Sequence, residues 1–230
     1  MVRYQRIVLH IPHSSPVFPI GYEDWSEGID RDIVRWTDWF TDWLFISATG
    51  NDPRIVPVCF PFSRFLCDVE RLPEDPLESV GQGIVYTDFG PRHRSLSTSC
   101  KEELFGRYYA PHIERLKSFL TPSSFLIDCH SFPEDLSDVE VCIGFNSDWS
   151  HPEEATLRMC AGVFERHGFQ VGLNEPYSNS ISPAMPFPYP SMMIELNKRT
   201  YMDRKGQLAY GKATRIMAAV GEMYGRILSL

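Results

Sequence analysis

The stretch Ser124-Phe-Leu-Ile-Asp-Cys-His-Ser131 contains the strongest strand signal of the chain, an apolar run that ends in polar side chains. A short, continuous apolar run of this kind is typical of a buried strand. Comparable runs occur at residues 6–11, near the N-terminus, and at residues 191–196, near the C-terminus. The sequence therefore predicts a sheet of buried strands, several of which end in residues that could carry chemistry.

Outward from this stretch, strand and helix patterns alternate along the chain, which favours an α/β fold. The other predicted strands are residues 6–11, 54–58, 139–144, 169–173 and 191–196, with a further extended segment at 64–69. The predicted helices are residues 30–48, 101–120, 152–167 and 207–228. We expect one domain over residues 1–230, because single α/β domains often reach about 250 residues.

The composition is that of a globular protein with a core, with 43% hydrophobic and 23% charged residues. The net charge of −8 argues against nucleic acid as a partner, because phosphate binding needs a basic surface. No run approaches the ~20 apolar residues of a membrane span, so no membrane partner is expected. The N-terminal apolar run is too short for a signal peptide, which predicts a cytoplasmic protein. The sequence leaves the oligomeric state open.

Two histidines directly follow predicted buried strands. His13 follows the strand at 6–11, and His130 ends the strand that begins at Ser124. In open α/β sheets, sites gather at the carboxyl ends of the strands. Each histidine alone is more often structural, since short motifs are weak evidence. Two of them at the ends of different strands favour a shared site.

A catalytic zinc site needs a third protein ligand besides two histidines. The segment at 36–43, Trp-Thr-Asp-Trp-Phe-Thr-Asp-Trp, offers two acids four residues apart. Asp38 and Asp42 would lie on one face of the predicted helix. Solvated acids on a helix whose tryptophans pack inward are an equally good interpretation of this pattern.

Glu195 lies near the end of the apolar run at 191–196. A carboxylate in such a buried strand is costly unless it is paired or functional. A zinc hydrolase needs this kind of group to take a proton from water and to deliver it to the leaving amine. A solvent-exposed glutamate on an edge strand is the alternative.

Arg64 and Arg71 flank the extended segment at 64–69. A guanidinium binds a carboxylate through a planar, two-pronged contact, so this pair suits an amino-acid-like substrate. Ion pairing with Asp68, Glu70 or other nearby acids explains the two arginines at least as well.

Taken together, eight segments of the chain resemble the N-formylglutamate amidohydrolase family. They follow the order and spacing of that family and cover nearly the whole chain. The segments are HIPHSS (10–15), WTDWFTDWLF (36–45), FSRFLCDVER (62–71), GQGIVYT (81–87), FLIDCHSFP (125–133), VCIGFN (141–146), NEPYS (174–178) and IELNKRTYMD (194–203).

The resemblance implies a three-layer α/β/α sandwich with a central mixed sheet, similar to the phosphorylase/hydrolase-like fold of the zinc carboxypeptidases. It implies hydrolysis of the amide bond of a small, acidic N-acyl amino acid, N-formylglutamate or a relative, by water activated at one zinc ion. His13, Asp38 and His130 match the expected metal ligands. Asp42 is the rival to Asp38, because the place of the acidic ligand in carboxypeptidase-like relatives is occupied here by Pro16.

The same resemblance assigns roles around the metal. Glu195 matches the general base of the wider zinc-peptidase plan. Arg64 and Arg71 fall in the segment that resembles the site for the substrate carboxylate, and Arg64 is also expected to stabilise the oxyanion. Tyr177 and Tyr201 are expected to hydrogen-bond the substrate.

The chain departs from the family pattern at Glu70, where relatives often carry asparagine. An acid there could repel a second substrate carboxylate, accept an ammonium group or pair with Arg71. Three other functions remain open. They are a zinc carboxypeptidase or deacylase with a different substrate, a metal-free protein that binds amino-acid-like ligands, and a cysteine hydrolase using Cys129. Cys129 and His130 are adjacent in a strand and would point to opposite faces, which argues against the last.

Overall fold

A computed structural model describes residues 4–89 and 92–230 and contains a six-stranded sheet with the strand order β2-β1-β5-β8-β6-β7. All neighbouring strands are parallel except β6 and β8, which are antiparallel, so the sheet is mixed. The strands are β1 (Arg6–Ile11), β2 (Ile55–Cys59), β5 (Ser124–Phe132), β6 (Val141–Gly144), β7 (Val171–Leu173) and β8 (Ser191–Asn197). Two short strands, β3 (Asp88–Phe89) and β4 (Arg92–His93), form a separate antiparallel ribbon.

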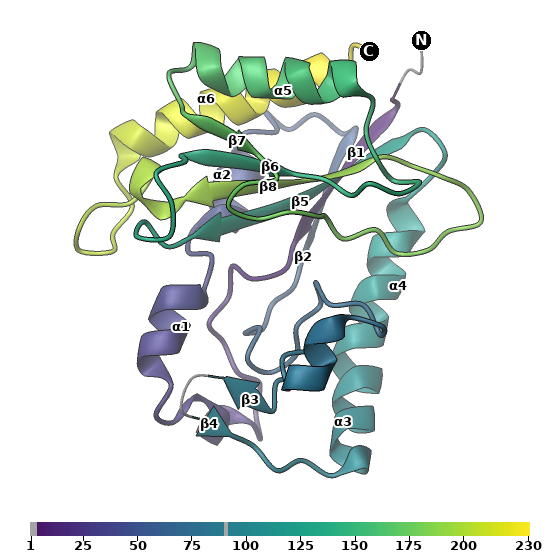
Figure 1. The fold of residues 1–230 in the computed structure, drawn as a ribbon, viewed down its shortest axis with the longest axis vertical. Helices are drawn as coiled ribbons and strands as arrows, with labels where there is room; N and C mark the ends of the chain where they lie inside the picture. Colours follow the sequence, from purple (N-terminus) through teal and green to yellow (C-terminus); the bar gives the residue numbers. More distant parts are fainter. Residues whose placement is uncertain (1–3, 90–91) are drawn as a thin grey trace.

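Helices cover both faces of the sheet (Figure 1). The α-helices are α1 (Asp30–Trp36), α2 (Thr41–Ser47), α3 (Thr98–Leu104), α4 (Ala110–Phe119), α5 (Glu154–Arg166) and α6 (Tyr210–Ile227). Short helical turns are η1 (Glu23–Ser26), η2 (Pro76–Val80) and η4 (Lys198–Thr200), and a π-helical segment, η3 (Phe105–Tyr109), joins α3 to α4. Helices α2, α5 and α6 pack on one face, and α4 packs on the other. The predicted α/β/α sandwich with a central mixed sheet is therefore confirmed.

The alternation of side chains along β5 separates core residues from site residues. Phe125, Ile127 and Cys129 pack into the hydrophobic core beneath α2, α5 and α6. Because successive side chains of a strand point to opposite faces, Asp128 and His130 point the other way, toward the α4 side. One strand therefore supplies both a core wall and two polar site residues.

The strand predicted at 6–11 is found with those bounds, and the other predicted strands are found with shifts of up to three residues at their ends. Two other predictions need correction. Residues 30–48 are not one helix, because Phe40 adopts a left-handed backbone conformation (φ 65°) between α1 and α2. Residues 64–69 form turns rather than an extended segment. Among the helices of the described residues, none combines the length and apolar character that a membrane crossing demands.

Candidate active site

The site lies where the carboxyl ends of β1, β5 and β8 meet. Strands β1 and β5 are parallel neighbours, so His13, just after β1, comes close to His130, near the end of β5. The centroids of the two imidazole rings are 5.0 Å apart. Glu195 of β8 is the direct register partner of His130. The structure thus brings together the three residues that were predicted from strand ends.

Asp38 lies in the turn between α1 and α2, beside both histidines. Its Oδ2 is 3.2 Å from Nδ1 of His130 and 3.7 Å from Nδ1 of His13. The backbone N–H of Asp38 donates to the carbonyl of His13, and the hydroxyl of Ser131 donates to Oδ1 of Asp38. Asp42 is exposed and accepts a hydrogen bond from the backbone of the adjacent Trp43. The break at Phe40 therefore separates the two acids that a continuous helix would have aligned.

The opposite edge of each imidazole faces a fully buried carboxylate. Nε2 of His13 is 2.8 Å from Oδ1 of Asp68, and Nε2 of His130 is 3.0 Å from Oδ1 of Asp128. A carboxylate can only accept, so Nε2 of His13 carries a proton. Burial lowers the pKa of His130, but Asp128, Glu70 and Asp38 outweigh it and raise that pKa well above its ordinary value. These carboxylates therefore favour the protonated form of His130 when no cation is bound.

Asp68 connects the histidines to the arginines. It accepts hydrogen bonds from Arg64 (2.9 Å) and from the hydroxyl of Tyr86 (2.7 Å), in addition to His13. Burial alone would raise the pKa of Asp68, but Arg64, His13 and Arg71 hold it well below its usual value. Asp68 is therefore an anion at physiological pH, and its contact with His13 was not predicted from the sequence.

Glu70 adds a second carboxylate beside the histidine pair. Its Oε1 is 3.7 Å from Nε2 of His130, and its Oε2 is 3.8 Å from Nε2 of His13. Ligand atoms of His13, Glu70 and His130 all lie within 4.8 Å of one another, so this group could hold a metal ion. Glu70 was not predicted as a ligand. The histidine pair thus has an acid on each side, Asp38 at the Nδ1 atoms and Glu70 at the Nε2 atoms.

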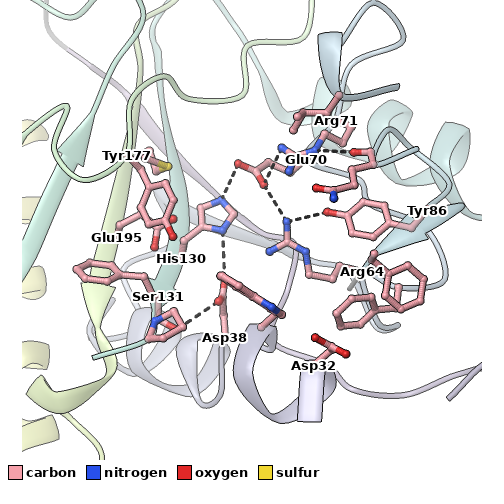
Figure 2. Close-up of a pocket in the computed structure, with 18 of the residues that line it drawn as sticks. Asp32, Asp38, Arg64, Glu70, Arg71, Tyr86, His130, Ser131, Tyr177 and Glu195 are labelled. Carbon is pink, nitrogen blue, oxygen red and sulfur yellow. Dashed lines mark hydrogen bonds and ion pairs between the residues drawn. The ribbon is translucent and has the colours of Figure 1, made fainter. Parts of the chain in front are cut away.

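A cavity of about 610 Å³ opens next to this cluster, a volume suited to a small-molecule site. Figure 2 shows how its side chains converge on His130. Six of the predicted site residues line it, namely Asp38, Arg64, Arg71, His130, Tyr177 and Glu195. His13 lies buried and does not line the cavity wall.

Glu195 is 8% exposed at the cavity wall, and its Oε2 has no hydrogen-bond partner within the described residues. Burial raises the pKa of Glu195 to about 8; His130 opposes this shift, and Asp38 and Glu70 add to it. The group can therefore hold a proton near neutral pH, which is the property that a general acid/base requires. The interpretation as an exposed edge-strand glutamate is wrong.

The two arginines face the cavity and also form ion pairs. Arg64 lies 2.9 Å from Asp68 and 3.8 Å from Glu70, while Nη1 of Arg71 lies 3.5 Å from Glu70. The structure therefore shows the ion pairs, and because both arginines also line the cavity, binding of a substrate carboxylate stays a prediction.

The two predicted tyrosines differ in their placement. Tyr177 lines the cavity, and its ring packs against Phe132 with centroids 5.9 Å apart. Burial raises the pKa of Tyr177 to about 12, so its hydroxyl remains a donor. Tyr201 is fully buried in the core beneath α6 and does not line the cavity. The structure therefore brings Tyr177, and not Tyr201, to the site.

Cys129 lies on the opposite face of β5 from His130, within the hydrophobic core. Burial raises the pKa of the Cys129 thiol well above its usual value. A protonated thiol that faces the core has neither the charge nor the access that a nucleophile needs. The structure argues against a cysteine hydrolase.

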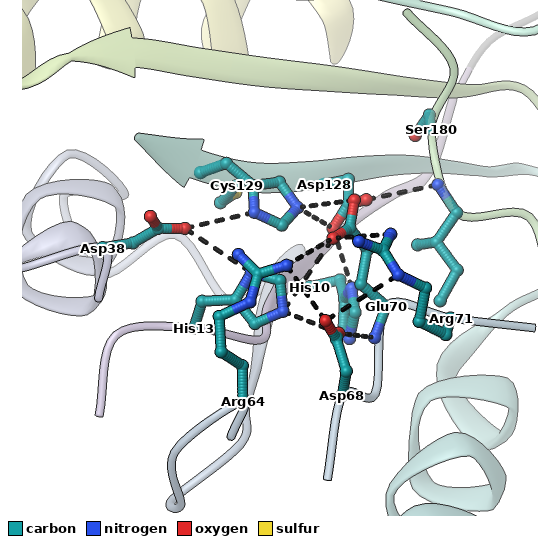
Figure 3. Close-up of polar contacts among 12 residues, drawn as sticks. His10, His13, Asp38, Arg64, Asp68, Glu70, Arg71, Asp128, Cys129 and Ser180 are labelled. Atoms are coloured by element: carbon teal, nitrogen blue, oxygen red, sulfur yellow. Dashed lines mark hydrogen bonds and ion pairs between the residues drawn. The ribbon is translucent and has the colours of Figure 1, made fainter. Parts of the chain in front are cut away.

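A hydrogen-bonded chain of buried residues extends from Asp128 toward α4 (Figure 3). Oδ1 of Asp128 is 2.8 Å from Nδ1 of His10, and Nε2 of His10 is 3.0 Å from Nε2 of His112. The backbone N–H of Ile181 donates to the other oxygen of Asp128. These contacts fix the carboxylate that faces His130, and sequence reasoning missed them.

The family model for N-formylglutamate amidohydrolase matches residues 5–202. The chain belongs to this family. Membership of the N-formylglutamate amidohydrolase family supports the prediction of an enzyme that hydrolyses amide bonds. No curated protein sequence matches the chain.

Two solved structures resemble the chain over almost its whole length. The N-formylglutamate amidohydrolase from Ralstonia eutropha JMP134 has a TM-score of 0.77 and 18% identity, covering 99% of this chain and 94% of that chain. A gene product from Agrobacterium tumefaciens has a TM-score of 0.73 and 17% identity, covering 99% and 92%. At these identities the likeness shows the fold alone, and the chemistry must be argued from the residues of this chain.

Proposed function

We propose that this protein is a zinc-dependent hydrolase of the amide bond in a small N-acyl amino acid. The observation that carries the proposal is the environment of the histidine pair. Both Nδ1 atoms face Asp38, and both Nε2 atoms face a buried carboxylate, at the edge of a cavity that also contains Glu195.

Asp38 lies at the spacing of a metal ligand from each histidine, whereas the group whose ligand atoms all lie within 4.8 Å of one another is His13, Glu70 and His130. Nδ1 of His13 is buried and has no hydrogen-bond partner among the described residues, which is costly unless a ligand completes it. In a tetrahedral zinc site with bonds of about 2.0–2.1 Å, neighbouring donor atoms lie roughly 3.4 Å apart. The distances of 3.2 and 3.7 Å from Oδ2 of Asp38 to the two Nδ1 atoms bracket that value. Asp38, His13 and His130 are therefore the ligands that we propose.

The group formed with Glu70 is the competing ligand set. The hydrogen bond of His13 favours Asp38, whereas Nε2 of His130 is buried without a hydrogen-bond partner among the described residues and favours Glu70. A metal on the Nε2 side would displace the contact of 2.8 Å between His13 and Asp68. A metal on the Nδ1 side preserves it, and metal-binding histidines almost always donate their other N–H to a carboxylate or carbonyl. We therefore assign Asp38 to the metal and Glu70 to the cavity wall beside Arg71.

Zinc, when bound, polarises the acyl carbonyl and lowers the pKa of a coordinated water. The chain supplies the proton transfers. Oε2 of Glu195, which has no hydrogen-bond partner among residues 4–89 and 92–230, takes the proton of the attacking water and delivers it to the leaving nitrogen. The burial of Glu195 keeps bulk water from exchanging that proton before the amide breaks.

Arg64 and Arg71 hold the carboxylate of the substrate in this proposal. Both guanidinium groups face the cavity, and each retains N–H donors beyond those used by Asp68 and Glu70. Fixing the carboxylate holds the scissile amide near Glu195, so that the free energy of substrate binding orients the reacting bond. Tyr177 supplies a neutral hydroxyl donor on the other side of the cavity.

Elemental analysis combined with a screen of formyl, acetyl and succinyl amino acids tests the proposal. We expect about one zinc per chain and hydrolysis that stops with a chelator and returns with zinc. Zinc-loaded protein that hydrolyses none of these compounds, yet binds them, would establish a ligand-binding protein instead.

A further inference from the structure

We infer that the amino acid released by this enzyme carries a positively charged side chain and no second carboxylate. The inference rests on the proposed function and concerns the same cavity. It comes from the charges that line the cavity on either side of Arg64.

At the arginine end, the positive charges are already balanced. Arg64 lies 2.9 Å from Asp68, and Arg71 lies 3.5 Å from Glu70 and 3.9 Å from Asp68. Two guanidinium groups therefore face two carboxylates. One substrate carboxylate can use the remaining N–H donors, but a second would meet the negative charge of Glu70, which lies 3.8 Å from Arg64 and 3.5 Å from Arg71.

On the other side of Arg64 lies Asp32, a half-buried residue of α1 that lines the same cavity (Figure 2). Its carboxylate makes no hydrogen bond or ion pair with any residue of 4–89 or 92–230. The other cavity acids have assigned partners or roles, since Asp38 faces the histidines and Glu195 transfers protons. Asp32 is therefore the carboxylate left to receive a charge from the substrate.

Aromatic rings also line this cavity, namely those of Trp36, Phe65 and Phe89. Ring faces attract cations, and guanidinium groups more often than ammonium groups. Two arginines already form cation–π contacts with these rings: the guanidinium carbon of Arg35 lies 5.2 Å from the ring centroid of Trp36, and that of Arg94 lies 4.8 Å from the ring centroid of Phe89.

Neither of those arginines lines the cavity, and both are engaged elsewhere. Arg35 pairs with Asp135, and Arg94 donates to the backbone carbonyls of Phe65 and Trp25. Asp32 is thus left for a cation that enters the cavity itself. A carboxylate in a cavity that aromatic rings also line fits the side chain of an arginine- or lysine-like amino acid.

The test compares kcat/KM of the zinc-loaded enzyme for the N-formyl and N-acetyl derivatives of arginine, lysine, methionine and glutamate. We expect the two basic derivatives to exceed methionine by at least about tenfold, with glutamate the poorest. Asp32→Asn should lower kcat/KM for the arginine derivative by roughly 10- to 100-fold, mainly by raising KM. It should leave kcat/KM for the methionine derivative nearly unchanged. Asp30→Asn, at an exposed acid of the same helix, is the matched control.

Glu70→Gln probes the other end of the cavity. It should raise kcat/KM for the glutamate derivative, because Arg71 loses its neutralising partner, while the zinc content stays at one per chain. The inference would be overturned if the wild-type enzyme had a higher kcat/KM for the glutamate derivative than for the arginine derivative. It would also be overturned if Asp32→Asn lowered kcat/KM equally for all derivatives. Either result would leave the proposed function intact. Absence of turnover with every derivative would instead refute the proposed function, and this inference with it.

Discussion

Replacing Asp68 by asparagine tests which edge of the histidine pair binds the metal. Asp68 accepts a hydrogen bond from Nε2 of His13 at 2.8 Å and is fully buried. If the ion binds at Nδ1, Asp68 orients the imidazole and makes it a stronger ligand. If the ion binds at Nε2 together with Glu70, Asp68 competes with the metal for the same nitrogen. The two arrangements therefore predict changes of zinc affinity with opposite sign.

The expected size follows from the contacts of Asp68. Losing such a partner typically weakens metal binding 10- to 100-fold, which corresponds to about 1.4–2.7 kcal/mol. Folding stability also falls, because Arg64 loses its nearest carboxylate at 2.9 Å. That loss should stay below the roughly 3–5 kcal/mol of a fully buried pair, since Arg64 is 16% exposed and keeps Glu70 at 3.8 Å.

The assay is a competition titration of metal-stripped protein against a chromophoric zinc chelator, with thermal melting to verify that the variant is folded. Tyr86→Phe is the matched control, because it removes a different donor to Asp68 and leaves the contact between Asp68 and His13 in place. We expect a weaker affinity for Asp68→Asn and little change for the control. An Asp68→Asn variant that binds zinc as tightly as wild type, or more tightly, would refute the assignment of Nδ1.

The other predictions concern the base, the ligands and one excluded residue. Glu195→Gln should keep its zinc and lose roughly 10²- to 10⁴-fold in kcat; an unchanged kcat would remove Glu195 from the mechanism. His130→Ala should lose most of its zinc by elemental analysis, and full occupancy would contradict its role. In the metal-free protein the pKa of Glu195 is raised from 4.5 to about 8, so the folded state keeps a proton that the unfolded state releases. The stability that this proton adds is present below pH 4.5 and is lost as the pH rises toward 8. The melting temperatures of wild type and Glu195→Gln, measured at a series of pH values, should therefore change differently between pH 4.5 and 8. The same pH dependence in both proteins would exclude the raised pKa of Glu195. Tyr201→Phe should leave KM unchanged, because Tyr201 does not line the cavity; a large rise in KM would restore it as a substrate-binding residue.

The sheet could be predicted because its central strands are buried on both faces and their apolar runs are continuous. The register of β5 and β8 then aligns His130 with Glu195, and alternation along the strands points both away from the core beneath α2, α5 and α6. Residues at the ends of buried parallel strands were therefore predictable as a group from the sequence alone.

The turn that carries Asp38 could not be predicted. The segment at 36–43 has the spacing of an amphipathic helix, but the backbone leaves the helix at Thr37, which is extended, and turns at Phe40, which is left-handed. A phenylalanine rarely adopts that conformation, so no local signal marks the break. The tertiary contact between the backbone N–H of Asp38 and the carbonyl of His13 overrides the local helical preference.

The carboxylates behind the histidines were missed for a different reason. Asp68 meets His13 across 55 residues of sequence, and His10 meets Asp128 across 118. Such contacts depend on the packing of whole elements and leave no periodic pattern in the chain. Local reasoning could assign Asp68 only to the neighbouring arginines, and that assignment was correct but incomplete.

The most direct test of the account is an anomalous difference map at the zinc edge from crystals grown with zinc. The account predicts one peak within about 2.1 Å of Nδ1 of His13, Nδ1 of His130 and a carboxylate oxygen of Asp38. A peak on the Nε2 side, bound by Glu70 and with Asp38 away from the ion, would contradict it.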